Sequence, residues 1–364
     1  MSVALANVTR TVGGVTHIRD ASLVLERGTL NVLLGPTLSG KTSLMRLLAG
    51  LDAPTKGRLL ANGRDVTGAH VRSRSVAMVY QQFINYPTLT VFENIASPLR
   101  VQRRRKKEIE ERVRGAAKLL KLEPYLDRLP LELSGGQQQR TAIARALVKD
   151  AELVLLDEPL ANLDYKLREE LREELPRVFE NSGAIFVYAT TEPSEALLLG
   201  GNTACLRAGE IVQFGRTIDI YNRPVSLYAA EVFSDPPLNT VAITLAGGVV
   251  TFSSGDRMPA RAQLSQLGDG PYTLAFRAHQ LTFGGGGTDQ SYTFPGKVLV
   301  SEITGSESFV HVACAGSEWV AVAAGVHNLP PGTPLTVAVD PSKLFVFEQT
   351  GRLVAAPSLT RGRG

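Results

Sequence analysis

The stretch GPTLSGKT, residues 35–42, fits the pattern G-x-x-x-x-G-K-[ST]. It ends the apolar run 30–35 and opens the segment 41–50, in which the apolar residues have helical spacing. A loop between a strand and a helix turns its backbone N–H groups towards phosphate oxygens. We expect Lys41 to reach the β- and γ-phosphates of a nucleotide and the Thr42 hydroxyl to ligate Mg²⁺. The residues assigned to phosphate contact are Gly35, Pro36, Thr37, Leu38, Ser39, Gly40, Lys41, Thr42 and Ser43.

The first part of the chain also contains short apolar runs that lack polar alternation. Runs of this kind are typical of strands in a parallel sheet that is covered on both faces. The predicted strands are 75–81, 153–157 and 184–190, and the predicted helices are 104–122 and 137–149. This order of strands and helices predicts an α/β domain built around the phosphate loop.

After about residue 235 the sequence changes from alternating strand-like and helix-like segments to short β-rich segments. Short β-rich pieces such as YTLAFRAHQLTF and GKVLVSEITG follow one another, separated by Gly and Pro turns. Short strands with this spacing predict a small barrel or sandwich. The segment FSDPPLN, residues 233–239, is the predicted linker.

The run LVLLDEP ends a predicted buried strand with two acidic residues. Asp157 is placed to hold Mg²⁺ through water, opposite the phosphate loop. Glu158 is placed to polarise the attacking water as a general base. An acidic pair at a strand end is a weak signal alone, but together with the loop 35–42 it favours hydrolysis of a nucleoside triphosphate.

The run LSGGQQQR, residues 133–140, predicts a second anion site. Its hydroxyl and two glycines precede a helix and form another N-terminus rich in backbone N–H groups. One chain needs only one such site for each γ-phosphate, so we expect the second to face the nucleotide of a neighbouring chain. The residues assigned to this contact are Ser134, Gly135, Gly136 and Gln137.

In this order, GPTLSGKT, LSGGQQQR and LLDEP resemble the motifs of the ATPase subunits of ABC transporters. FSDPPLN followed by β-rich segments is similar to the sugar-importer branch, which includes the maltose-importer ATPase. The resemblance covers nearly the whole chain. It implies a P-loop (RecA-like) ATPase domain at 1–233, with a helical subdomain at about 86–147. It also implies a β-rich regulatory domain of oligonucleotide-binding, TOBE-like type at 234–364.

The resemblance implies roles for further residues. Gln81 matches a glutamine that contacts Mg²⁺ and senses the permease, and the segment 85–95 is expected to face coupling helices of the transmembrane subunits. Leu163 and Asp164 match a loop that contacts the other subunit across the dimer, and Asp164 is assigned to the nucleotide site. Thr191 stands where the family has a switch histidine that contacts the γ-phosphate.

The cofactors implied are ATP and Mg²⁺. The partners implied are a second ATPase subunit, two transmembrane permease subunits and, indirectly, an external binding protein. A formal net charge of +4 is weak for nucleic-acid binding. No apolar run approaches the roughly 20 residues that span a bilayer, and the first residues lack the pattern of a signal peptide. The expected location is therefore the cytoplasmic face of the bacterial inner membrane, as a peripheral subunit.

Four residues depart from the family pattern. Thr191 keeps a hydroxyl but cannot accept and return a proton as imidazole does. Val12 stands where an aromatic ring normally stacks on adenine, a contact worth roughly 1–3 kcal/mol by analogy with nucleic-acid stacking, and His17 is a candidate substitute. Leu38 replaces a glycine of the phosphate loop, and Ala161 replaces a serine. The LSGGQ signature and the acidic pair are unchanged.

Because three of these changes lie on the chain's own nucleotide face, we favour pairing with a different ATPase. In that arrangement the intact signature completes the partner's site, while the chain's own site hydrolyses slowly or mainly binds ATP. A fully active homodimer is the simpler alternative, and a regulatory scaffold is another. ABC proteins of translation or DNA repair are disfavoured, because they generally carry two cassettes or a long coiled coil. The cargo is expected to be a sugar or a polyol such as glycerol.

Three other features are expected to be structural. Cys205 and Cys314 are too few for a disulfide framework and are expected to be small buried hydrophobic residues. The basic run 103–107 is expected to be solvated, with contact to anionic lipid as the alternative. Trp319 is expected to pack in the β-rich part rather than to stack on carbohydrate.

Overall fold

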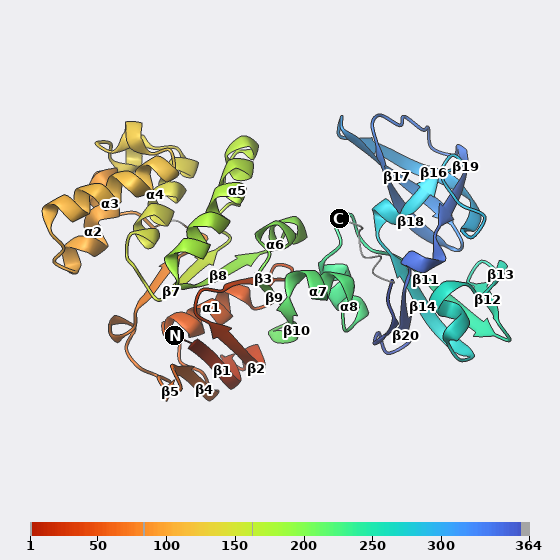
Figure 1. Cartoon of the computed structure of the whole chain (residues 1–364), viewed down its shortest axis with the longest axis horizontal. Helices are drawn as coiled ribbons and strands as arrows, with labels where there is room; N and C mark the ends of the chain where they lie inside the picture. Colours follow the sequence, from red (N-terminus) through yellow and green to blue (C-terminus); the bar gives the residue numbers. More distant parts are fainter. Residues whose placement is uncertain (1, 83, 162, 358–364) are drawn as a thin grey trace. The chain divides into compact units, whose positions relative to one another are not determined.

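The computed structural model describes residues 2–82, 84–161 and 163–357. The chain divides after Thr217 into two compact units, each described by itself below. Their elements are labelled in Figure 1. The domain boundary after residue 233 stays a prediction.

A six-stranded sheet forms the centre of the first unit. Its strands pair in parallel, except that β10 runs antiparallel to β9. Every residue of β7 and β8 is buried, as the non-alternating apolar runs predict. In spatial order the strands are β10 (Glu210–Arg216), β9 (Asn202–Arg207), β3 (Leu30–Leu34), β8 (Ile185–Thr190), β7 (Leu153–Asp157) and β6 (Val76–Val79). The α/β class predicted for this part is confirmed.

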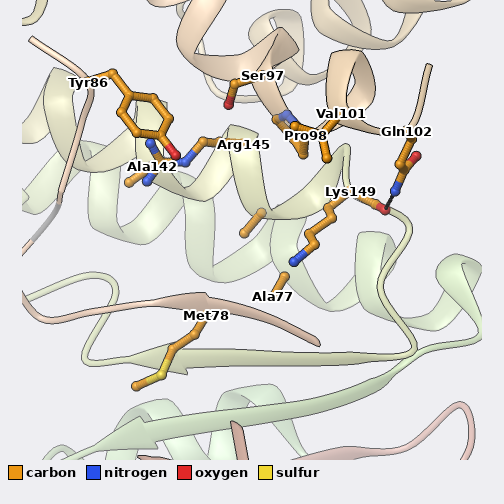
Figure 2. Close-up of a pocket in the computed structure, with 11 residues that line it drawn as sticks. Ala77, Met78, Tyr86, Ser97, Pro98, Val101, Gln102, Ala142, Arg145 and Lys149 are labelled. Carbon is orange, nitrogen blue, oxygen red and sulfur yellow. Dashed lines mark hydrogen bonds between the residues drawn. The ribbon is translucent and has the colours of Figure 1, made fainter. Parts of the chain in front are cut away.

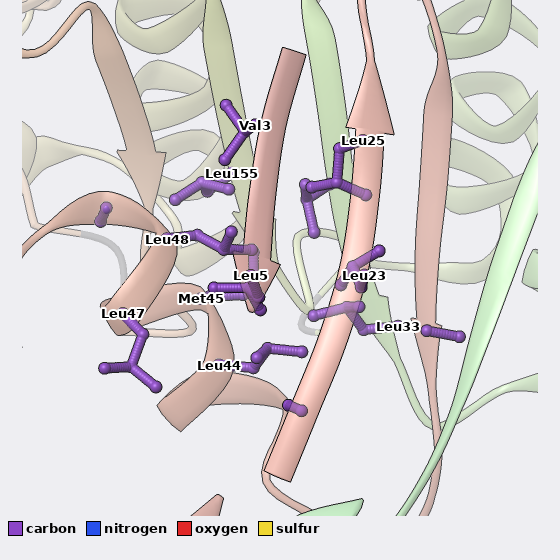
Figure 3. Close-up of a cluster of buried hydrophobic side chains, with 14 of the residues drawn as sticks. Val3, Leu5, Leu23, Leu25, Leu33, Leu44, Met45, Leu47, Leu48 and Leu155 are labelled. Carbon is purple, nitrogen blue, oxygen red and sulfur yellow. The ribbon is translucent and has the colours of Figure 1, made fainter. Parts of the chain in front are cut away.

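The two faces of this sheet are covered differently (Figure 1). Helix α1 (Lys41–Ala49) packs its apolar residues between the central sheet and a four-stranded antiparallel sheet, and Figure 3 shows this core. On the opposite face lie α5 (Tyr165–Ser182) and α6 (Pro193–Leu199), where the ring of Phe179 stacks on Phe186 at 4.1 Å between centroids. The antiparallel strands are β2 (Val15–Glu26), β1 (Ser2–Val12), β4 (Lys56–Ala61) and β5 (Arg64–Asp65).

Three helices occupy the predicted helical region: α2 (Val91–Val101), α3 (Lys106–Leu119) and α4 (Gly135–Leu147). Helix α3 begins two residues later than predicted, after Arg103, which has a left-handed φ of 57°. Helix α4 begins two residues earlier than predicted, because Ser134 caps it. Short 3₁₀ turns lie at Val71–Ser73, Glu123–Tyr125 and Pro130–Glu132. The basic run 103–107 is exposed, as expected.

The second unit contains two antiparallel sheets around one core. One sheet has the order β13 (Arg257–Pro259), β12 (Val249–Phe252), β11 (Asn239–Ala246), β14 (Gly270–Phe276), β20 (Phe345–Glu348) and β21 (Leu353–Ala355). The other has the order β15 (Leu281–Phe283), β19 (Pro334–Val339), β16 (Tyr292–Ile303), β17 (Glu307–Cys314) and β18 (Ser317–Ala324). Helices α7 (Thr217–Asn222) and α8 (Leu227–Val232) precede the sheets, and 3₁₀ turns lie at Ala262–Gln266, Ala278–Gln280 and Pro341–Lys343.

Trp319 lies in the core of this second unit, as predicted. It is fully buried, its ring meets Phe276 and Phe294 edge to face, and its indole N–H donates to the carbonyl of Thr240 at 3.1 Å. Cys205 and Cys314 are also buried, and burial raises the pKa of each thiol to about 12. The β-rich architecture predicted for this part is confirmed.

The parallel strands place three loops at one edge of the central sheet. Leu34 pairs with Thr190, and Asp157 pairs with Ala189, so β3, β7 and β8 end at the same level. In sheets of this kind ligands bind outside the carboxyl ends of the strands. This edge therefore brings together the loops that follow the three strands.

The separation of the large buried cluster of the first unit from that of the second predicts independent responses to core truncation. Leu48→Ala in the first unit and Leu274→Ala in the second each remove a buried side chain from a different cluster. Each variant is expected to lower the free energy of unfolding of its own unit by about 2–5 kcal/mol. Trp319 is the only tryptophan, so its fluorescence reports the second unit, whereas far-UV circular dichroism reports mainly the helices of the first. Equal shifts of both signals in either variant would contradict this expectation.

Candidate nucleotide-binding site

The loop 35–42 connects the end of β3 to the start of α1. A Cβ at Gly35 would lie 2.6 Å from the carbonyl oxygen of Leu206, and one at Gly40 would lie 3.1 Å from that of His17. Gly40 is also the N-cap of α1, with φ of 107°, and no side chain caps this helix end. The first N–H groups of α1 are therefore available to an anion, as the motif predicts.

Lys41 lies inside this loop with 5% of its surface exposed. Its Nζ donates to the carbonyl oxygens of Gly35 at 2.8 Å and Pro36 at 3.1 Å, and lies 3.5 Å from Oε1 of Glu158. Burial lowers the pKa of the Lys41 ammonium, and the carboxylates of Glu158 and Asp157 act in the opposite direction. The loop thus holds a desolvated cation where phosphate charge is expected.

Thr42 and Asp157 meet across the sheet edge. The Thr42 hydroxyl donates to Oδ2 of Asp157 at 2.9 Å. Asp157 is 2% exposed, and burial raises the pKa of its carboxyl, while the hydrogen bond from Thr42 lowers it. A hydroxyl and a carboxylate in contact are the kind of oxygen donors that Mg²⁺ takes, so this pair fits the predicted metal.

Gln81 and Glu158 complete the cluster. Nε2 of Gln81 donates to Oε2 of Glu158 at 2.9 Å, so one carboxylate contacts both the amide and the Lys41 ammonium. Glu158 has a left-handed φ of 47°, and its backbone N–H donates to the carbonyl of Ala189 at 3.0 Å. The strained backbone turns this side chain away from the path of β7. Predicted residues from three separate segments are therefore in mutual contact.

A buried polar atom in the loop independently fits a phosphate. Ser39 is 2% exposed, and its hydroxyl has no hydrogen-bond partner among the described residues. Its backbone is satisfied, because its N–H donates to Pro36 and its carbonyl accepts from Gly209. A buried hydroxyl without a partner is costly unless something outside the chain satisfies it. A phosphate oxygen is a suitable acceptor for this group.

The LSGGQ segment forms the N-terminus of α4 but does not join this cluster. Ser134 and Gln137 make a capping box, in which the Ser134 hydroxyl accepts from the Gln137 N–H at 3.3 Å and Oε1 of Gln137 accepts from the Ser134 N–H at 2.9 Å. Ser134 and Gly135 are exposed. Within the described residues, no hydrogen bond or ion pair links Ser134, Gly135, Gly136 or Gln137 to the loop 35–42.

The departures from the family pattern lie at exposed tips. Val12 is at the turn between β1 and β2 with 49% of its surface exposed, and Leu38 is 95% exposed with a left-handed φ of 67°. Thr191 is exposed just after β8. Asp164, which matches the family pattern, caps α5: its carboxylate accepts a hydrogen bond from the Leu167 N–H at 3.0 Å. The roles of these residues towards a nucleotide stay predictions.

A second concave site lies between α2, α4 and β6, with a volume of about 320 Å³ (Figure 2). Arg145 lies over the ring of Tyr86 at 5.1 Å and donates to the carbonyl of Ile84, while Lys149 donates to the carbonyl of Val76. Burial lowers the pKa of both Arg145 and Lys149, and neither forms an ion pair with a described residue. The sequence analysis missed both cations, although they stand four residues apart in a predicted helix.

Tyr86, from the segment 85–95, lines this groove. Asn94 is fully buried, and its side-chain amide donates to the carbonyls of Tyr86, Leu89 and Thr90. Thr90 and Glu93 form a capping box at the start of α2. The loop before α2 is thus held rigidly beside the two cations.

Comparisons with known proteins agree with this geometry. A family model described as "ABC transporter" matches residues 18–161, and one described as "TOBE domain" matches residues 274–347. The chain is 34% identical to a trehalose/maltose import ATP-binding protein of Thermococcus litoralis, over 96% of this chain and 98% of that one. It is 35% identical to an sn-glycerol-3-phosphate import ATP-binding protein of Rhizobium meliloti (96% and 99%), and 32% identical to an alpha-glucoside transport ATP-binding protein of the same organism (96% and 98%).

Solved structures match the first part of the chain. A dimeric ATP-binding cassette in a post-hydrolysis state, bound to ADP and phosphate, has a TM-score of 0.54 and 30% identity, covering 59% of this chain and 98% of that one. A dimeric bacterial ABC transporter cassette has a TM-score of 0.55 at the same identity and coverage.

The left-handed backbone at Leu38 predicts that replacing this residue by glycine stabilises the first unit. A left-handed conformation costs a non-glycine residue about 1 kcal/mol, and the exposed side chain contributes no packing. Leu38→Gly is therefore expected to raise the free energy of unfolding of the first unit by about 1 kcal/mol. Leu38→Ala removes the side chain but keeps the strain, so it is the matched control and is expected to change little. Equal stabilities of the three proteins in urea would contradict the backbone explanation.

Asp157→Asn is expected to stabilise the chain in the absence of ligand but to remove its response to Mg²⁺-ATP. Because burial raises the folded-state pKa of Asp157, its ionisation costs stability as the pH rises from 3.8 through that raised value. The advantage of the asparagine variant should therefore appear above pH 3.8 and vanish below it. Thermal unfolding across this range, with and without Mg²⁺-ATP, measures both effects. Asp127→Asn on the exposed surface is the control, and a loss of stability in Asp157→Asn at neutral pH would refute the argument.

Proposed function

The chain belongs to the ATP-binding proteins of ABC transporters that carry a TOBE domain, and on that premise we propose that it drives an importer of a sugar, a polyol or a polyol phosphate. The substrate class comes from relatives that are named for import of trehalose and maltose or of glycerol 3-phosphate. One observation carries the proposal: the phosphate loop, the acidic pair and Gln81 meet in one cluster at the carboxyl edge of the parallel sheet.

The chain's own residues account for ATP hydrolysis. The N–H groups at the start of α1, the Ser39 hydroxyl and the Lys41 ammonium bind and orient the β- and γ-phosphates. Thr42 and Asp157 would hold Mg²⁺, which neutralises phosphate charge when bound. Glu158 is placed to accept the proton of the attacking water.

The exposed N-terminus of α4 supports a second role in a dimer. Its glycine N–H groups lie outside the chain's own cluster and are available to the nucleotide of a neighbouring ATPase subunit. The matching solved cassettes are dimeric, which supports the same arrangement. ATP bound between two subunits would draw them together, and hydrolysis would release them.

The groove beside α2 is the surface we assign to a transmembrane permease subunit. No helix among the described residues is long and apolar enough to cross a membrane, so the spanning helices belong to other chains in this proposal. The groove combines Tyr86 with the exposed Val101 and two cations, Arg145 and Lys149. A short helix from a permease on the cytoplasmic side of the membrane fits such a groove.

The exposed residues that depart from the family pattern favour pairing with a different ATPase subunit. Thr191 offers no imidazole, Val12 offers no ring for adenine, and Leu38 adds a side chain to the phosphate loop. We infer that this chain pairs with a different ATPase subunit, whose site it completes with an intact signature. A homodimer with full activity, or a scaffold with vestigial hydrolysis, is the competing assignment.

ATP turnover of the purified chain tests these assignments. We expect slow turnover that Thr191→His raises at least about tenfold, because an imidazole can accept and return a proton. Glu158→Gln in either background should abolish turnover, which shows that the activity belongs to this site. Fast turnover of the unmodified chain, with no gain from Thr191→His, would favour the homodimer. Binding of Mg²⁺-ATP with no turnover in any variant would favour the scaffold.

A further inference from the structure

The segment that joins β8 to α6 carries Thr191 and Glu192. The side chain of Thr191 is exposed and makes no hydrogen bond to another described residue. The backbone next to it is held, because the Glu192 N–H donates to the Thr190 hydroxyl at 3.0 Å. The position of the Thr191 hydroxyl therefore depends on what holds Glu192.

Two arginines of α5, one turn apart, bind the carboxylate of Glu192. Nη1 of Arg168 donates to Oε1 at 3.2 Å, and Nη2 of Arg172 donates to Oε2. Each carboxylate oxygen thus has its own guanidinium, a geometry that fixes both the distance and the rotation of the side chain.

Arg172 anchors this contact to the sheet. It also lies 3.3 Å from Oε1 of Glu195, a carboxylate with 4% of its surface exposed. Oε2 of Glu195 accepts from the hydroxyl of Tyr188, which is buried in β8, at 3.1 Å. Helix α5, strand β8 and the start of α6 are joined in this way by one polar network.

Arg168 connects the network to the segment that follows the general base. Its Nη2 donates to the carbonyl of Leu163 at 3.4 Å, five residues after Glu158. At the other end of that segment, the Glu158 N–H donates to Ala189. The segment after β7 is therefore tied to β8 beside Glu158 and to the segment after β8 through Arg168 and Glu192.

The network is not arranged for maximum stability. The Nε groups of Arg168 and Arg172 are buried and have no hydrogen-bond partner among the described residues, and each such group costs about 1–3 kcal/mol. The ion pairs to Glu192 are partly exposed, and pairs of this kind contribute only about 0–1 kcal/mol. A costly arrangement with little net stabilisation points to a role in placing the groups it connects.

We propose that Glu192 is a positioning residue for ATP hydrolysis, whose carboxylate, held by Arg168 and Arg172, sets the place of the Thr191 hydroxyl relative to Glu158. The proposal rests on the ATPase function proposed above. In this proposal the Glu192 carboxylate aligns the reacting groups without touching the nucleotide itself.

The test compares single-turnover hydrolysis of Mg²⁺-ATP by the full-length chain and its variants. Glu192→Gln keeps the shape but removes the charge, and is expected to lower the rate about tenfold, because small misplacements of reacting groups are costly. The apparent affinity for Mg²⁺-ATP should stay within about twofold of wild type, since the phosphate loop is untouched. Glu192→Asp keeps the charge and should restore part of the rate. Glu173→Gln, on the exposed face of α5, is the matched control.

A double-mutant cycle separates positioning from general damage. Arg168→Gln is expected to lower the rate as Glu192→Gln does, and the double variant should be no slower than the slower single variant, because each substitution breaks the same Arg168–Glu192 ion pair. Loss of rate that follows loss of folded protein in thermal unfolding, with no rescue by Glu192→Asp, would overturn the proposal.

The outcomes for this residue and for the whole function are distinguishable. A wild-type chain that hydrolyses ATP at the same rate as Glu192→Gln would refute the positioning role and leave the ATPase function intact. A wild-type chain that hydrolyses no ATP, even in a single turnover, would refute hydrolysis at this site, and the positioning role with it.

Discussion

The buried ammonium group of Lys41 is the constraint around which the ATPase unit is organised. A desolvated cation is unstable in a protein interior unless oxygen atoms surround it. Two carbonyls of the phosphate loop and the carboxylate of Glu158 supply those oxygens, and they follow two different strands, β3 and β7. The parallel register of β3, β7 and β8 is what brings them to one point. The same register then places Thr42 against Asp157, so the proposed phosphate and metal positions have one structural origin.

Much of the fold was predictable from local signals. The apolar runs of β7 and β8, the loop 35–42 and the turn-rich texture after residue 235 each specify their own structure from a few neighbouring residues. Helix ends were less predictable, because the left-handed Arg103 and the Ser134 capping box moved two helix starts by two residues. Capping depends on backbone angles that composition does not reveal.

Features that depend on tertiary contacts were not visible in the sequence. Arg145 and Lys149 line a groove only because α4 packs beside α2 and β6, and nothing in their spacing indicates that burial. In the same way, the link between Arg168 and Glu192 depends on how α5 lies against β8. Arg168 and Glu192 are 24 positions apart, and no sequence pattern predicts their contact, because it forms only when α5 packs on the sheet.

The location of the unusual residues explains how a nucleotide site can change while its fold persists. Val12, Leu38 and Thr191 have exposed side chains, so their substitution disturbs no core packing and leaves no buried group unpaired. Lys41 and Glu158 form an ion pair, so losing the Glu158 carboxylate would leave the buried Lys41 ammonium without its charged partner. Breaking this ion pair therefore costs more folding stability than a substitution at Val12, Leu38 or Thr191. A chain that serves mainly to present the N-terminus of α4 to a neighbour can lose nucleotide contacts at Val12, Leu38 and Thr191. It still keeps the sheet that supports that helix.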